Sequence, residues 1–419
     1  MNSPATAAPG RRSFAALRHP GYRGFFFAFA GAMMADSIEH VISYWMMFQK
    51  FQSNALGAFA VISHWVPFLL LSLPVGALAD RFDPRRLIQI GMCLFMGVSI
   101  AWGVLFTTDT LEVWHAMLLL TLHGIAGVLW TPSSQVLLHH VVPVEHLQSA
   151  VRLNATARHL GLLGGPAVGG VLLLLLGPEK GILLNALIYV PTIIWLWKAP
   201  YSPPKDAGAP RSTRALLSVG DITSTLRRIG EHRTLLSMIL LSGGASFFVG
   251  NAYLPQMPDF ARSLGHGDAD ISYSVLLGAD ALGALTAGFL LESRGWLMPN
   301  PRTAMILAML YCCAMAGFAM SSFYSLAVLL LFVAGFVELS FNSMSQTLVQ
   351  MNAPTDIRGR VIGVFSMMAL GLRSFSGVTV GLMGAAIGIH ASLAISALAL
   401  LALSALLFVR VGKPVTAHD

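Results

Sequence analysis

The sequence predicts an all-α integral membrane protein with twelve transmembrane helices in two pseudo-symmetric six-helix bundles. Of its 419 residues, 55% are hydrophobic and only 11% are charged, whereas a soluble domain carries about 25% charged residues. Apolar segments of membrane-spanning length recur along the whole chain. One long hydrophilic stretch divides these segments into two sets of six.

The apolar segments define the predicted helices. A helix needs about 20 mostly apolar residues to cross a bilayer. The expected spans are 23–48, 55–79, 87–106, 113–141, 150–176, 180–198, 233–257, 270–291, 302–320, 324–350, 360–384 and 388–409.

Basic residues between the spans indicate the orientation. If the N-terminus lies in the cytoplasm, only Lys50, Lys180 and Arg262 fall on the opposite side, and all other lysines and arginines outside the spans are cytoplasmic. Cytoplasmic loops carry the excess of Lys and Arg in membrane proteins. We therefore expect a multi-pass protein of the cell (inner) membrane with both termini in the cytoplasm.

The hydrophilic stretch 199–232 is rich in proline, serine and arginine and predicts a cytoplasmic linker. The expected organisation is a cytoplasmic tail (1–22), an N-terminal bundle (23–198), the linker, a C-terminal bundle (233–410) and a second tail (411–419). The halves also repeat: Gln135 and Pro143 align with Gln346 and Pro354 at one constant offset. Such repeats are typical of transporters whose substrate site lies between the halves.

The loop after the second span combines a glycine, an acidic residue and several arginines. It reads Gly76-Ala-Leu-Ala-Asp80-Arg81-Phe-Asp-Pro-Arg85-Arg86. Gly76 permits close helix contact, and Asp80 ends its helix where the N-terminus of a facing helix can hold a carboxylate. We expect a conformational latch here, with Arg358 and Arg360 contributing from the loop after the tenth span. A plain positively charged anchor is the alternative.

This loop resembles the signature loop of the major facilitator superfamily. The Asp83-Pro84 pair departs from the common form, which has a glycine, and resembles the branch that contains the enterobactin exporter and macrolide-efflux proteins. The resemblance covers nearly the whole chain and implies secondary transport.

The fifth span carries a glycine-rich motif that resembles the antiporter motif of the same superfamily. Its residues are Gly161, Gly165, Pro166, Gly169 and Gly170. Small residues four apart allow close helix packing, and proline bends a helix. In the family this motif marks exporters, although ordinary helix packing also explains it.

Ionisable residues inside the spans are the candidate site. A charge at the bilayer centre costs about 2.5–3.5 kcal/mol even on lenient scales, so these residues should face a cavity or pair with one another. The proposed cavity residues are Asp36, Glu39, His40, Asn154, Arg158, Asp280, Glu338, Asn342 and Arg373.

Asp36, Glu39 and His40 share one face of the first span, because they stand at i, i+3 and i+4. We expect Asp36 and Glu39 to carry the coupling proton, with His40 tuning them. Arg158 and Arg373 either pair with these acids, which would make static ion pairs, or hold an anionic group of the substrate. His64 and His123 are interpreted as packing residues.

Other functions are disfavoured by what the sequence lacks. It contains no nucleotide-binding loop, catalytic triad, cofactor motif or zinc-binding cysteine pattern, and its basic residues do not form a nucleic-acid-binding stripe. We expect no enzyme activity, no cofactor and no bound metal. The expected protein is monomeric, and its partners are a small-molecule substrate, protons and the lipid bilayer.

The leading hypothesis is proton-coupled export of a small amphipathic molecule, drug-like or siderophore-like, by alternating access. The alternatives are an importer of the same fold, a divalent-cation transporter that uses Asp36, Glu39 and His40, and a non-transporting membrane sensor or scaffold.

Overall fold

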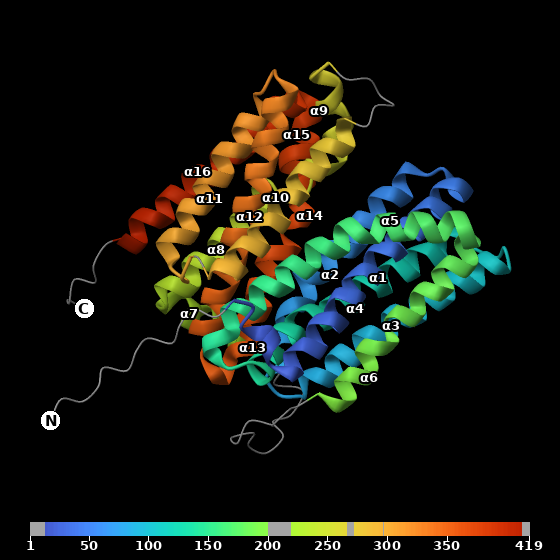
Figure 1. Ribbon diagram of the computed structural model, residues 1–419, viewed down its shortest axis with the longest axis horizontal. Helices are drawn as coiled ribbons and strands as arrows, with labels where there is room; N and C mark the ends of the chain where they lie inside the picture. The colour runs from blue at the N-terminus through green and yellow to red at the C-terminus, as the bar shows by residue number, and fades with distance from the viewer. Residues whose placement is uncertain (1–12, 200–218, 266–271, 296, 413–419) are drawn as a thin grey trace.

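The computed structural model describes residues 13–199, 219–265, 272–295 and 297–412, and all regular secondary structure in these ranges is helical (Figure 1). The N-terminal helices are α1 (Pro20–Phe51), α2 (Asn54–Ala79), α3 (Pro84–Thr107), α4 (Val113–Val141), α5 (Leu147–Ile188) and α6 (Val190–Lys198). The later helices are α7 (Val219–Glu231), α8 (Arg233–Phe248), α9 (Met257–Ser263), α10 (Ser272–Arg294), α11 (Pro301–Ala319), α12 (Tyr324–Asn352), α13 (Arg358–Ser366), α14 (Arg373–Ser376), α15 (Met383–Ile387) and α16 (Ile389–Gly412).

Twelve membrane crossings are present in the described part of the chain. Ten segments are long and apolar enough to span a membrane, and α8 is a shorter apolar helix. The segment 144–198 counts twice because its path breaks at Gly177, where φ is 76° and Pro178 follows. A positive φ favours glycine, and a proline cannot continue the hydrogen-bond ladder of a preceding helix. The predicted fold class is therefore confirmed.

Two predicted spans differ from the observed helices. The span predicted over 233–257 ends at Phe248, because the chain turns at Gly250 with φ of 50°. The span predicted over 180–198 is interrupted at Tyr189, one residue before α6 begins with Pro191 in its first turn. Hydropathy continues across both interruptions, so it could not locate them.

The eleventh crossing, residues 358–387, is irregular. Between α13 and α15 it contains two π-helical segments, Met367–Gly371 and Gly377–Leu382, with α14 between them. π-Segments inside transmembrane helices change the direction of the side chains that follow and are frequent at functional sites. Arg373 begins α14 and therefore lies between the two distortions.

The predicted linker contains a helix. Residues 200–218 lie outside the described part of the chain, as do residues 1–12 and 413–419 of the predicted tails. The rest of the linker forms α7. Its Asp221 contacts Arg81 at 3.8 Å, and its Arg228 binds Asp356 at 2.6 Å. Helix α7 thus touches loops of both bundles, and the domain boundaries themselves stay predictions.

The two bundles meet at the end of the molecule that carries these loops. There α2 packs against α13, and α5 packs against α10 and α12. Figure 1 shows the bundles in contact around α13 and separated near α9 and α15. Between described residues, the hydrogen bonds that join the bundles all lie at the contacting end.

Candidate functional site

The seal between the bundles depends on backbone contact between two glycines. A methyl group at Gly76 of α2 would overlap the carbonyl oxygen of Gly359 at the start of α13, and the converse is also true. One helical turn away, Gly363 also packs closely against the backbone of Ser72. Small residues permit such close helix approach within membranes. The predicted latch glycine therefore lies at a close backbone contact within the seal.

Asp80 holds the same contact electrostatically. Its carboxylate accepts hydrogen bonds from the backbone N–H groups of Gly359 and, at 3.0 Å, of Arg360. The Arg360 guanidinium lies 3.5 Å from the carboxylate. Burial nevertheless raises the pKa of Asp80 to about 6, against the opposing effect of these donors. The carboxylate thus occupies the positive N-terminus of α13 at a considerable desolvation cost.

A second acidic contact closes the other side of the seal. Glu292 near the end of α10 accepts a hydrogen bond from Ser149 of α5. Arg152 donates to the carbonyl oxygens of Leu291 and Leu297 at 3.1 and 2.5 Å. The two acids hold the first turns of α13 and α5, which belong to opposite bundles. The repeat in the sequence therefore corresponds to a pseudo-symmetric pair of contacts.

The remaining predicted latch arginines lie around the same loops. Arg85 binds Asp83 at 2.8 Å and the carbonyl oxygen of Ala199 at 2.6 Å. Arg86 donates to Gln89 at 2.8 Å. These contacts join the loop to the N-terminal bundle and to the first residue of the predicted linker, so they fix the loop rather than join the halves.

The glycine-rich motif of the fifth span packs α5 against α1. A Cβ at Gly161 would lie 2.7 Å from Met33, one at Gly169 would lie 3.3 Å from Val41, and one at Gly165 would overlap Ser37. Gly170 faces open space, and Pro166 lines the cavity described next. The motif therefore holds the two helices that carry most of the candidate charges at close distance.

A cavity of about 350 Å³ lies between the bundles. Its wall on α2 includes Val61 and Trp65, whereas Ser72 and Gly76 further along α2 form the seal. The seal therefore closes the cavity at one end, on the side of the loops. Asp36 and Arg158 from the N-terminal bundle and Arg373 from the C-terminal bundle line the cavity together.

His123 of α4 links the two carboxylates of α1. Its Nδ1 lies 2.7 Å from Oε1 of Glu39, and its Nε2 lies 2.9 Å from Oδ1 of Asp36. Ser99 donates a hydrogen bond to the other oxygen of Glu39. Glu39 is buried with 2% of its side chain exposed, whereas Asp36 is 17% exposed and faces the cavity. Asp36 is thus the accessible end of a three-residue chain.

This arrangement requires an exchangeable proton. A neutral imidazole carries one N–H, and an ionised carboxylate only accepts. Both ring nitrogens of His123 face a carboxylate oxygen, so two hydrogen bonds need one proton more than a neutral histidine and two carboxylates supply. That proton makes either an imidazolium or a carboxylic acid. The Asp36–His123–Glu39 chain therefore holds one additional proton, and Asp36 is its member that lines the cavity.

His40 and His64 surround this chain. The His40 ring is 4.6 Å from the His123 ring and 5.0 Å from the His64 ring, measured between centroids. His40 Nδ1 contacts the backbone oxygen of Asp36 at 2.7 Å and lies 3.9 Å from its Oδ2. Nδ1 of His64 is buried without a hydrogen-bond partner among the described residues.

The two arginines do not pair with the acids. Among the described residues, neither Arg158 nor Arg373 forms an ion pair within 4 Å. Arg373 lies over Trp65, with its guanidinium carbon 5.2 Å from the ring centroid, and its Nε is buried without a hydrogen bond. Static ion pairing, one of the sequence-based alternatives, does not describe either residue in this conformation.

The other predicted cavity residues lie elsewhere. Asp280 of α10 accepts a hydrogen bond from Tyr253 at 3.4 Å, and Glu338 and Asn342 are half-buried on α12. Asn154 is buried on α5 and accepts a hydrogen bond from Tyr22 at 2.9 Å. Among the described residues, the lining of the cavity does not include these four side chains.

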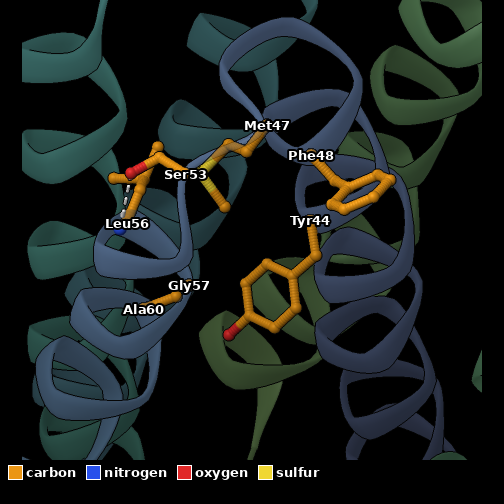
Figure 2. A pocket seen from close by; sticks show the side chains of 7 residues that line it. All are labelled: Tyr44, Met47, Phe48, Ser53, Leu56, Gly57 and Ala60. Carbon is orange, nitrogen blue, oxygen red and sulfur yellow. Dashed lines mark hydrogen bonds between the residues drawn. The ribbon is translucent and has the colours of Figure 1, made fainter.

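A second pocket, of about 310 Å³, opens between α1 and the start of α2 (Figure 2). Its walls are mostly apolar and include Met47 and Phe48 from α1 and Leu56 and Ala60 from α2. Figure 2 shows Tyr44 pointing from α1 into the space between the helices. Tyr44 also lines the central cavity, so the two spaces share one wall.

His123, interpreted from the sequence as a packing residue, contacts both carboxylates of α1. The spacing of residues within α1 identified Asp36 and Glu39. The sequence of α4 gives no sign that His123 contacts α1. Only the packing of the two helices reveals the contact.

Comparisons with known proteins agree with this architecture. The family model described as "transmembrane secretion effector" matches residues 11–419. The uncharacterized MFS-type transporter YkuC of Bacillus subtilis is 23% identical over 57% of this chain and 56% of its own length. The multidrug efflux pump Tap of Mycolicibacterium fortuitum is 24% identical over 87% of this chain and 90% of its own. The Na(+), Li(+), K(+)/H(+) antiporter of Planococcus maritimus is 24% identical over 78% of this chain and 82% of its own length.

The fold also matches a solved structure. The fucose:proton symporter FucP of Escherichia coli superimposes with a TM-score of 0.73 at 13% identity, over 96% of this chain and all of FucP. Members of the superfamily move small molecules across membranes and are not enzymes. Because the family model covers nearly the whole chain, the protein is a multi-pass transporter of the major facilitator superfamily and belongs to its transmembrane secretion effector family.

Proposed function

We propose that this transporter is a proton-coupled exporter of a small amphipathic molecule, drug-like or siderophore-like, which acts as a monomer in the cell inner membrane. Both termini lie in the cytoplasm, so the sealed end is cytoplasmic and the conformation described here faces outward. The observation that carries the proposal is the Asp36–His123–Glu39 chain, which borders a cavity closed on the cytoplasmic side.

Two similarities support the direction and the coupling. Relatives of this chain include a protein named as a multidrug efflux pump and one named as a cation/proton antiporter. The glycine motif of α5 also resembles the motif that marks exporters in the superfamily, and it packs α5 onto the helix that carries Asp36 and Glu39.

The geometry supports the following proposed transport cycle. In the outward-facing state a proton reaches Asp36 from the cavity and joins the hydrogen bonds of His123. The bundles then rock, the cytoplasmic seal opens and the outer end closes. Release of the proton to the cytoplasm frees Asp36 for the next substrate molecule, so proton entry and substrate exit alternate.

Flux in everted membrane vesicles tests this function. A library of labelled amphipathic compounds should contain at least one that the vesicles accumulate when their lumen is acidic, and collapse of the pH gradient should abolish that accumulation. Glu39→Gln preserves the shape of the side chain but cannot ionise, so it should abolish gradient-driven accumulation. Binding of the compound should persist, because Glu39 does not line the cavity.

Glu231→Gln is the matched control, because Glu231 is exposed on α7 and, among the described residues, forms its ion pair with Arg227. Full gradient-driven accumulation by Glu39→Gln would refute the assigned coupling site. Accumulation only in right-side-out vesicles would instead favour an importer.

The cytoplasmic seal should respond to pH through Asp80. When the seal opens, Asp80 regains water and its ordinary pKa, near 3.8, so the sealed state with a pKa of about 6 binds a proton more tightly. The sealed population should therefore rise as the pH falls through about 6 toward 4, and this contribution is lost above 6. Val144 and Met351 are exposed and lie at the sealed end of the molecule. The distance between spin labels at these two positions measures the sealed population.

Asp80→Asn cannot titrate and should remove this part of the pH response. An unchanged pH response in Asp80→Asn would contradict the assignment to Asp80.

Divalent-cation transport is a second candidate that one observation favours. The ligand atoms of His40, His64 and His123 lie within 4.8 Å of one another. Both nitrogens of His123 already contact carboxylates, however, so a metal would have to displace one of them. Thermal stabilisation by Zn²⁺ or Co²⁺ that disappears in His64→Ala would support this candidate.

A further inference from the structure

The central cavity presents two arginines that form no ion pair among the described residues and one carboxylate oxygen that accepts no hydrogen bond there. Arg158 and Arg373 form no ion pair within 4 Å among the described residues. The Oδ2 atom of Asp36 accepts no hydrogen bond there, because His123 binds Oδ1 and His40 Nδ1 stays 3.9 Å away. Uncompensated charges inside a membrane protein are costly. A ligand that carries complementary charges would offset this cost.

The two arginines point to an anionic group. They come from opposite bundles, on α5 and α14, yet line one cavity, so their like charges repel. Guanidinium groups bind carboxylates and phosphates through paired hydrogen bonds. Trp65 stacks on Arg373 and limits its freedom. An anion between the arginines would also relieve the repulsion that opposes approach of the two bundles.

Asp36 points to a cationic group on the same ligand. Its carboxylate borders the cavity that holds Arg158 and Arg373, and its free oxygen can accept from an ammonium group. A cation at this oxygen competes with protonation of the same carboxylate. That competition is what exchange of substrate for protons requires.

The walls between these charges are apolar and aromatic. They include Trp65, Phe68, Phe95, Trp130, Leu162 and Leu370. Such walls favour a flat or aromatic ligand body. Tyr44 lines both this cavity and the second pocket and adds a further aromatic side chain to the wall.

We propose that the substrate is an amphipathic zwitterion. Its anionic group binds between Arg158 and Arg373, its cationic group binds Oδ2 of Asp36, and its apolar body packs on the aromatic wall. This assignment rests on the proposed exporter function and names the substrate class of the same cavity. The anionic end bridges the two bundles, and the cationic end displaces the proton.

Four probes with one aromatic body test the proposal. They are 3-(2-naphthyl)alanine, which is zwitterionic, its methyl ester (a cation), its N-acetyl derivative (an anion) and the N-acetyl methyl ester, which is neutral. Binding to the purified full-length protein in detergent is measured by equilibrium dialysis of the labelled compounds. The zwitterion should bind at least about tenfold more tightly than each singly charged probe, because each lost charge-assisted hydrogen bond weakens binding by that order.

Variants separate the two charges. Arg373→Gln and Arg158→Gln should weaken binding of the zwitterionic and anionic probes about tenfold and leave binding of the cationic probe unchanged. Asp36→Asn should weaken binding of the zwitterionic and cationic probes and leave binding of the anionic probe unchanged. Arg227→Gln is the control for the loss of an arginine, because Arg227 is exposed on α7. Circular dichroism and elution as a single species show that each variant is folded.

Equal affinity for the four probes, binding of none of them, or a uniform loss in every variant would overturn the inference. Charge-selective binding without gradient-driven flux would keep the zwitterion site and reject the proposed exporter function. Gradient-driven export of compounds that bind equally well without an anionic group would reject the zwitterion site alone.

Discussion

Gly359→Ala should shift the transporter out of the conformation in which the seal is closed, change the equilibrium constant of that shift about 5- to 150-fold and reduce transport. The added methyl group would overlap the carbonyl oxygen of Gly76 and approach the carboxylate of Asp80 to 2.7 Å. The obstacle at Gly76 is backbone, which cannot move aside as a flexible side chain can. Overpacking of this kind costs about 1–3 kcal/mol, enough to shift a balanced conformational equilibrium by that factor.

Paired spin-label distances measure this shift at both ends. The sealed end is reported by Val144 and Met351, and the outer end by Thr108 and Met320, all of which are exposed. In Gly359→Ala the first distance should lengthen and the second should shorten. Gly97→Ala adds the same methyl group to α3 where nothing lies within 4 Å and should change neither. Identical distances in Gly359→Ala and the parent would refute the role of the glycine contact.

His123→Gln should abolish proton-coupled transport while the substrate cavity keeps its lining. Glutamine can donate to one carboxylate but cannot bridge Asp36 and Glu39 or carry an extra proton. Breaking a buried, hydrogen-bonded charge network costs about 3–5 kcal/mol, so the melting temperature should also fall. Because His123 does not line the cavity, substrate should still bind and move down its own gradient.

The matched control is His390→Gln. His390 also makes two contacts, with the carbonyl oxygen of Ala319 at 2.6 Å and with Ser263 at 2.9 Å, but it lies in the C-terminal bundle away from the cavity. Gradient-driven accumulation should survive in this variant. Equal loss of accumulation in both variants would indicate general destabilisation rather than a loss of coupling.

The fold was predictable because each crossing places about 20 residues in the hydrocarbon core of the bilayer. These residues must be mostly apolar, and the hydropathy of the sequence shows where they are. The prediction failed at local breaks. Gly250 and Pro191 interrupt apolar runs without a change of polarity, and α7 forms inside a stretch whose composition resembles a linker. These features depend on backbone geometry and on contacts with both bundles, which composition does not encode.

The candidate site was only partly predictable for a related reason. Helical spacing places Asp36 and Glu39 on one face of α1, but the partner of both is His123, 87 and 84 residues away along the chain. The sequence left two roles open for Arg158 and Arg373, pairing with the acids or binding an anionic group of the substrate. In the structure the histidine pairs with the acids instead, which leaves both arginines directed at the cavity.

Proton release on binding tests the central claim most directly. Purified protein in weakly buffered detergent, with a pH-indicator dye, is mixed with a compound that the vesicle assay has shown to be transported. The parent protein should release protons as the compound binds, and Glu39→Gln should bind the compound and release none. Binding without proton release by the parent protein, or equal release by Glu39→Gln, would contradict the assignment of the transported proton to the Asp36–His123–Glu39 chain.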